Sequence, residues 1–301
     1  MTAQQRDMID QILRNAPFDL GGDVVAQRPL LDQMLTSQPL PADVRVTPAD
    51  LGGIPVIFID IVGAKPRGTI FHIHGGGFAL GSAEGSTGLA SSLARKTGMR
   101  AVSVDYRLAP EHPYPAALQD VTAAYRALTG QPGSADHIVV SGESAGGNLA
   151  LELLIAGKAD SLTMPAAGLL LSPMTALTVT GASYAGKAHA DPAITAQAIS
   201  TRAADYLAGT DPADPLVSPI FADLSGLPPL LIQAGSHEVL LDDATRLAAK
   251  AAADDVAVIL DITPGVPHVF QAFAALLDEG DAALNRAARF VQDNTAQKAA
   301  T

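Results

Sequence analysis

Short apolar runs alternate with longer helical patterns through most of this 301-residue chain, and this alternation limits its fold more than any other feature. Runs of this length suit buried strands, and the segments between them place apolar residues at helical spacing. Strands that alternate with helices indicate βα units, which build a mostly parallel sheet with helices on both faces. The runs lie at 68–73, 101–104, 138–140, 168–171, 230–234 and 256–262, and the helical patterns at 85–97, 113–128, 144–156, 242–253 and 281–296.

The first part of the chain does not follow this alternation. Met8, Ile12 and Leu13 lie at helical spacing, and a second such group follows before residue 40, so two short amphipathic helices are predicted. Residues 44–47 and 55–62 are strand-like and flank a Gly-Gly turn. This arrangement predicts an antiparallel hairpin at one edge of the sheet.

A long insertion interrupts the alternation between two strands. Residues 175–218 contain Pro192, Pro212 and Pro215 and one helical pattern near 195–207. An insertion of this length usually packs over a site. We therefore predict a cap built from residues 1–44 and 175–218, covering an α/β domain formed by residues 45–174 and 219–301.

The amino-acid composition limits the kinds of partner that the protein is expected to bind and the cellular compartment in which it is expected. Hydrophobic residues make up 48% of the chain and charged residues 17%, which is enough apolar surface for a large core. A formal charge of −12 disfavours nucleic acids and anionic membranes as partners. The chain has no cysteine, its first twenty residues show no secretory pattern, and no apolar run approaches the roughly 20 residues that cross a bilayer. We expect a cytoplasmic protein.

A G-x-S-x-G motif lies where one apolar run meets a helical pattern. Gly142-Glu143-Ser144-Ala145-Gly146 follows the strand-like residues 138–140. A sharp strand-to-helix turn brings the backbone close on both sides of Ser144, so both glycines supply steric room. The turn presents the serine hydroxyl at the carboxyl end of the strand, beside the free N–H groups of the helix start. An ordinary glycine-rich turn is the alternative interpretation.

Three consecutive glycines follow another predicted strand, in His74-Gly75-Gly76-Gly77-Phe78. Such a loop can direct two amides toward one point, as an oxyanion hole for a tetrahedral intermediate requires. We predict the N–H groups of Gly76, Gly77 and Ala145 as its donors. A nucleotide-phosphate loop is disfavoured, because residues 75–81 match neither G-x-x-x-x-G-K-[ST] nor G-x-G-x-x-G.

A serine hydroxyl is a weak nucleophile, so it needs a base and a carboxylate that orients the base. His268 follows the last predicted strand in a Gly/Pro loop, and it completes the order serine, acid, histidine. For the acid, the loop after residues 230–234 offers three carboxylates, and Glu238 is preferred. Asp242 and Asp243 are interpreted instead as caps and dipole partners of the following helix.

Several motifs in the same order resemble those of the hormone-sensitive lipase family of α/β-hydrolases, in particular its bacterial carboxylesterases. The resemblance spans residues 40–295. It implies an α/β-hydrolase fold with an eight-stranded sheet, a cap, and hydrolysis of esters with short or medium acyl chains. It also implies Ser144 as nucleophile, His268 as base, and Gly76, Gly77 and Ala145 as oxyanion donors. The motifs are 74–78, 105–117, 142–147, 214–216 and 267–270.

The chain departs from this family pattern at three places. Glu143 stands where Asp is common, and we expect little effect because its side chain should point away from the reacting carbonyl. Glu238-Val239-Leu240 replaces the usual Asp-Pro-Leu, as in a branch of the family that uses Glu as its acid. Met174 and Ala176 replace Trp and Asp, a change at the pocket wall.

The hypothesis is therefore a serine carboxylesterase with the triad Ser144, Glu238 and His268, acting on a small-molecule ester without a metal or cofactor. A lactone hydrolase with the same triad, and a small-molecule receptor without catalysis, are the alternatives. The apolar last strand, Val256 to Ile262, should lie at a sheet edge and pair with its copy in a homodimer.

Overall fold

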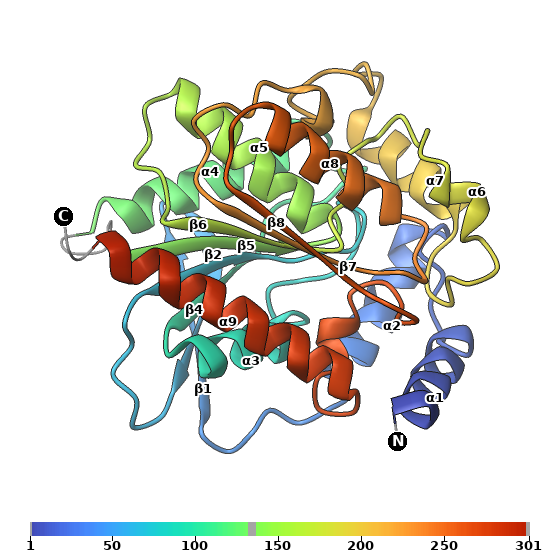
Figure 1. The fold of residues 1–301 in the computed structure, drawn as a ribbon, viewed down its shortest axis with the longest axis horizontal. Helices are drawn as coiled ribbons and strands as arrows, with labels where there is room; N and C mark the ends of the chain where they lie inside the picture. Colours follow the sequence, from blue (N-terminus) through green and yellow to red (C-terminus); the bar gives the residue numbers. More distant parts are fainter. Residues whose placement is uncertain (1, 132–136, 299–301) are drawn as a thin grey trace.

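An eight-stranded sheet forms the centre of the structure, a computed structural model that describes residues 2–131 and 137–298 (Figure 1). Its strand order is β1-β2-β4-β3-β5-β6-β7-β8. β2 is antiparallel to β1 and β4, and every other neighbouring pair is parallel. The mostly parallel α/β architecture predicted from the alternation is confirmed. The strands are β1 Val44–Leu51, β2 Ile54–Ile61, β3 Thr69–Ile73, β4 Arg100–Val104, β5 Ile138–Glu143, β6 Ala167–Leu171, β7 Leu230–Gly235 and β8 Val258–Thr263.

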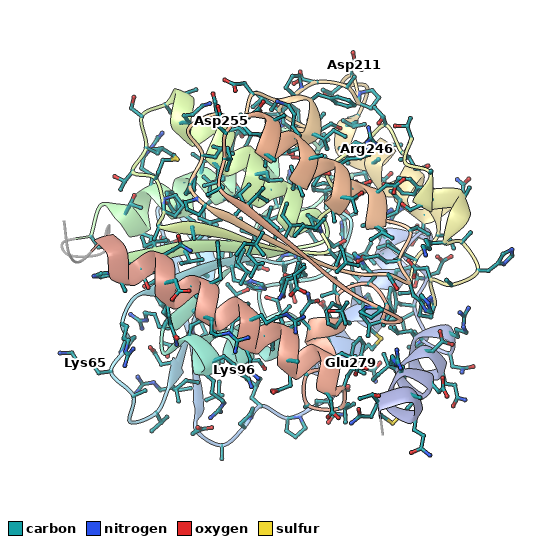
Figure 2. All side chains as sticks on the ribbon, in the orientation of Figure 1. Lys65, Lys96, Asp211, Arg246, Asp255 and Glu279 are labelled. Atoms are coloured by element: carbon teal, nitrogen blue, oxygen red, sulfur yellow. The ribbon has the colours of Figure 1, made fainter. Side chains whose placement is uncertain are left out.

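Helices cover both faces of this sheet (Figure 1). α3 and α9 lie together on one face, and α4, α5 and α8 lie on the other. Side chains fill the layers between sheet and helices, while charged residues such as Lys65 and Asp211 extend outward at the periphery (Figure 2). The main helices of these layers are α3 Thr87–Thr97, α4 Ala116–Thr129, α5 Ala145–Ala159, α8 Leu241–Ala253 and α9 Asp278–Lys298.

The apolar runs are continuous because the central strands are buried on both sides. All five residues of β6 are buried, and so are all six residues of β7. Near the edge this changes, since β1 has a single buried residue, Leu51. The predicted hairpin is present: Leu51 pairs with Ile54, and Gly52 and Gly53 take positive φ values of 66° and 87° in the turn.

The N-terminal helices and the insertion lie together at one end of the sheet (Figure 1). α1 (Thr2–Arg14) and α2 (Val24–Thr36) come from the first segment, and α6 (Ser183–Gly186) and α7 (Ala196–Leu207) come from the second. A Cβ at Gly21 would touch the backbone of Ala198, which places the two segments in direct contact. Within the described residues, no helix has both the length and the apolar character that crossing a membrane requires.

Helix α1 is rotated relative to the face expected from its sequence. Met8 and Ile12 are 40% and 42% exposed, whereas Ile9 is fully buried. Ile9 packs in a small core cluster with Val266 and Phe270, on either side of position 268. The N-terminal helix therefore supports the loop after β8, a contact that helical spacing alone could not reveal.

Strand β8 forms one edge of the sheet, since it pairs with β7 alone among the described strands. Its side chains Ile259 and Leu260 are 53% and 39% exposed. An edge with unpaired backbone groups and apolar side chains favours pairing with another strand. We propose that two copies of the chain pair through β8 as a homodimer.

Light scattering at micromolar concentration tests this dimer, and the expected mass is about 62 kDa, twice the 30.8 kDa of the chain. Ile259→Lys should shift the mass toward the monomer, because the ammonium would be buried at the interface. Val46→Lys on the opposite edge strand is the matched control, since Val46 is 43% exposed. A wild-type mass near 31 kDa would contradict the proposal.

Candidate active site

Ser144 lies in a strained turn between β5 and α5. Its φ and ψ are 55° and −121°, a conformation that L-residues rarely adopt. The backbone is packed so closely here that a Cβ at Gly142 would collide with the Gly146 carbonyl. A Cβ at Gly146 would collide with the carbonyl of Ile73. Both glycines of the motif are thus required by backbone contact, as the sequence predicts.

The glycine loop after β3 lies directly against this turn. A Cβ added at Gly75 would lie 3.2 Å from the Cβ of Ser144. Gly76 and Gly77 take φ values of 107° and 63°, which only glycine adopts readily. Among the described residues, no acceptor binds the backbone N–H groups of Gly76, Gly77 or Ala145. The amides without an acceptor therefore belong to Ala145, next to the serine, and to the two glycines that follow the contact at Gly75.

His268 and Glu238 are paired in the loops that follow β8 and β7. His268 Nδ1 lies 2.6 Å from Glu238 Oε2. The other carboxylate oxygen accepts the Gly235 N–H at 2.6 Å and the Ser172 hydroxyl at 3.1 Å. Glu238 is fully buried, so these donors offset the cost of removing its charge from water. The geometry is that of a carboxylate that orients an imidazole.

The serine follows β5 and the histidine follows β8, and contacts at the end of β6 link the two loops. The Ser144 N–H donates to the Leu171 carbonyl at 2.9 Å, and the next residue, Ser172, accepts the Val269 N–H at 3.1 Å. The Ser144 hydroxyl itself makes no hydrogen bond to any residue that the structure describes. The structure thus brings His268 and Glu238 into contact, and the bond between Ser144 and His268 remains a prediction.

Ser172 is a residue whose importance sequence reasoning missed. It is fully buried, has a φ of 46°, and its hydroxyl joins Glu238 to the backbone of Val269. One side chain thus positions both the acid and the loop of the base. The only sequence signal was its place at the end of an apolar run, next to Pro173.

The electrostatic surroundings of His268 favour its protonated form. Burial alone would lower the pKa of the imidazole, but the Glu238 carboxylate raises it above the ordinary histidine value, with smaller contributions from Asp191 and Glu143. Asp191 lies in the insertion of residues 175–218, and its Oδ2 accepts the Val239 N–H at 2.8 Å. The insertion therefore adds negative charge to the surroundings of this histidine.

The two aspartates at the start of α8 do not cap their own helix. Asp243 Oδ2 accepts the N–H groups of Thr175 and Ala176 at 2.7 and 3.0 Å. Asp242 Oδ2 accepts the N–H of Ser183 at 3.0 Å. Both carboxylates hold the insertion against the α/β domain, and this corrects the interpretation of them as caps. Sequence could not show it, because the partners are 59 to 68 residues away.

In residues 2–131 and 137–298, no cluster of three or more His, Asp or Glu side chains is arranged to hold a metal ion. A cavity of about 690 Å³ lies away from the pair of His268 and Glu238, and none of the predicted triad residues lines it. Residues around it include Arg28, Asp105, Tyr106, Arg107 and His112.

Comparison with known proteins agrees with this geometry. The family described as alpha/beta hydrolase fold matches residues 70–272. An esterase of Acinetobacter venetianus is 40% identical over 266 residues, covering 88% of each chain. An acetyl-hydrolase of Streptomyces hygroscopicus is 38% identical over 229 residues, covering 76% of this chain and 77% of that one. The crystal structure of an esterase from the bacterial hormone-sensitive lipase family superimposes with a TM-score of 0.93 at 37% identity, covering 97% and 98% of the two chains.

The fold, the strained serine and the relatives together define a carboxylic ester hydrolase. The chain belongs to the α/β-hydrolase family and, within it, to the bacterial hormone-sensitive lipase group. It is an esterase, and the alternative of a receptor without catalysis has no support among these relatives.

Replacing Ser172 tests whether its buried hydroxyl positions Glu238 and His268. Ser172→Ala removes one hydrogen bond to the carboxylate and leaves the Val269 N–H without its acceptor. Hydrogen bonds to charged groups contribute about 1.5–3 kcal/mol, so kcat/KM for p-nitrophenyl butyrate should fall about 10- to 100-fold.

The matched control is Ser225→Ala, because Ser225 is exposed and lies outside the site. Its kcat/KM should equal that of the wild type. A Ser172→Ala enzyme that also keeps wild-type kcat/KM would contradict the positioning role.

Proposed function

We propose that the chain hydrolyses esters with short or medium acyl chains through an acyl-enzyme on Ser144. The Ser144 oxygen bonds to the ester carbonyl carbon while His268 Nε2 takes its proton. Collapse of the tetrahedral intermediate expels the alcohol, which receives that proton from His268. Water, activated by the same imidazole, then attacks the acyl-serine and releases the carboxylic acid.

Three N–H groups without acceptors beside Ser144 are the observation that carries this proposal. Backbone amides need partners, and free ones in a packed site suit a charge that appears only during reaction. Gly76, Gly77 and Ala145 supply these donors, and the start of α5 adds its dipole. They would bind the oxyanion of the tetrahedral intermediate.

The pairing of His268 with Glu238 supplies the second requirement. Since Glu238 binds Nδ1, the remaining ring nitrogen, Nε2, is the one that would face the serine. Catalytic hydrogen bonds of this type tighten when substrate binds. The added methylene of Glu relative to Asp is accommodated by the donors from Gly235 and Ser172.

The proposed acyl range rests on the relatives, one of which is named as an acetyl-hydrolase. A panel of p-nitrophenyl esters from acetate to laurate should show the highest kcat/KM at acetate to hexanoate. Lactones in the same panel test the alternative of a cyclic-ester hydrolase, which would require higher rates on the rings than on linear butyrates.

Ser144→Ala tests the nucleophile. The variant should lose the burst of p-nitrophenol that accompanies acylation, and its kcat should fall by at least about 10,000-fold, because no covalent path remains. A fluorophosphonate probe should label the wild type at Ser144 and leave the variant unlabelled. Turnover by Ser144→Ala above about 1% of wild type would reject the assignment.

The pH profile tests the base. Only the neutral imidazole of His268 can accept the serine proton, and the neighbouring carboxylates raise its pKa above the ordinary value of 6.5. As pH falls through that pKa the base is protonated, so kcat/KM should decrease in a single step with its midpoint above 6.5. At higher pH the profile should reach a plateau.

Glu238→Gln tests the base a second time, by removing the carboxylate that is paired with His268. Loss of the carboxylate removes the largest influence that raises the pKa of His268, so the midpoint should move to lower pH while the plateau activity drops. A wild-type profile that is flat between pH 5 and 8 would contradict His268 as the base.

A further inference from the structure

Glu143 precedes the proposed nucleophile, and its side chain is 12% exposed. Its carboxylate joins two segments that are far apart in sequence. Oε1 accepts the Gly75 N–H at 2.9 Å, and Oε2 lies 2.9 Å from Nε2 of the fully buried His72. His72 belongs to β3, which pairs with β5 in parallel register, Ile73 beside Gly142. The side chain thus points into the glycine loop.

In the first half of the glycine loop the polar backbone groups are paired, whereas two N–H groups of the second half have no acceptor among the described residues. In the first half, the His74 carbonyl accepts the Tyr106 hydroxyl at 2.9 Å, and the Gly75 carbonyl accepts His74 Nδ1–H at 2.7 Å. Glu143 binds the Gly75 N–H, so every polar backbone group from the His74 carbonyl to the Gly75 carbonyl is paired. In the second half, no described residue accepts the N–H of Gly76 or Gly77.

We infer that Glu143 is a positioning residue for the oxyanion hole, which it acts on through Gly75. By holding the Gly75 N–H away from the serine, the carboxylate fixes the peptide planes that follow. Those planes direct the Gly76 and Gly77 N–H groups toward the place where the oxyanion forms. The inference rests on the proposed function and deepens it, because Glu143 is the one residue of the G-x-S-x-G motif to which the triad, the amide donors and the close backbone contacts give no role.

Glu143 acts as a hydrogen-bond acceptor for the Gly75 N–H, and its negative charge does not itself favour the reaction. An oxyanion beside a carboxylate is repelled by it, so negative charge at position 143 by itself opposes the reaction. Burial alone would raise the pKa of the Glu143 carboxyl, but His72 and the Gly75 N–H hold it below its usual value. The carboxylate is kept ionised as a strong acceptor for the Gly75 amide.

Two substitutions with side chains of nearly the same length as glutamate test separately whether position 143 needs a hydrogen-bond acceptor or a negative charge. Glu143→Gln removes the charge and keeps a carbonyl oxygen that can accept the Gly75 N–H. Glu143→Met removes both the charge and the acceptor. Glu84→Met is the control for the substitution itself, because Glu84 is exposed and lies outside the site. All rates are expressed per active site, titrated with a fluorophosphonate, so that misfolded protein is not counted.

The first readout is hydrolysis of p-nitrophenyl butyrate at plateau pH, where His268 is neutral in every variant. We expect Glu143→Gln to keep kcat within about fivefold of wild type, and Glu143→Met to lose about 10- to 100-fold in kcat with KM changed less than about threefold. An interaction made only in the transition state lowers kcat in this manner.

The second readout is the inhibition constant of an aryl trifluoromethyl ketone, whose adduct with serine places an oxyanion in the hole. For Glu143→Met, this constant should rise by about the same factor as kcat/KM falls. A general structural defect would lower the number of titrated sites and leave the remaining sites with normal affinity.

The third readout is the acid limb of kcat/KM. Glu238, Asp191 and Glu143 are the carboxylates that raise the pKa of His268, so both uncharged variants should move this limb to lower pH by the same amount. Their equal shift would show that the difference in kcat between Gln and Met comes from the acceptor.

Two results would overturn the inference: equal kcat for Glu143→Met and wild type per titrated site, or an equal loss in the Gln and Met variants. The proposed function would fail in a different way. In that case the wild type itself would show no burst and no labelling of Ser144, whatever residue stands at position 143.

Discussion

The close contact of three backbone segments around Ser144 is the constraint on which the site depends. The start of α5 touches the end of β3 at Gly146 and Ile73, and the glycine loop touches the serine at Gly75. The positive φ of Ser144 costs on the order of 1–3 kcal/mol, and such strain persists only where the surroundings enforce it. Here the enforcing contacts are backbone against backbone, so glycine is the only residue that fits at these positions.

Buried carboxylates connect the segments that this packing brings together. Glu238 joins β7 to the loop of His268, and Glu143 joins β5 to the loop after β3. Asp243 and Asp191 connect the insertion to the α/β domain in the same manner. A buried carboxylate is costly unless several donors face it, and each of these accepts backbone N–H groups. Glu143, Asp191 and Asp243 therefore bind the main chain of a distant segment, whereas Glu238 binds the nearby Gly235 N–H and the distant side chains of Ser172 and His268.

The sequence predicted well which residues follow the ends of the strands and so lie near one another in the site. Parallel strands end at the same edge of a sheet, so residues that follow β5, β7 and β8 must lie near one another. This is why Glu238 and His268 could be proposed as partners although 30 residues separate them, and the structure places them 2.6 Å apart. Ser172 escaped notice and Glu143 was expected to have little effect, because a lone serine or glutamate at the end of a strand has no pattern that indicates its partner. Asp242 and Asp243 were misread for a related reason: their position favoured helix capping, and the competing acceptor role came from a distant segment.

The amino-acid sequence by itself determined the order of strands and helices, the glycines that the sharp turn requires, and the chemical types placed at each strand end. These follow from periodicity, from steric limits on φ and ψ, and from the local chemistry of a few residues, all of which act over short stretches of chain. Tertiary structure alone decided which face of α1 is buried, which amides lack acceptors, and which side chains bind Glu238 and Gly75. Those outcomes depend on contacts between residues far apart in the chain, such as Ile9 with Phe270 and Gly75 with Glu143, and only the packing of the whole sheet brings such residues together.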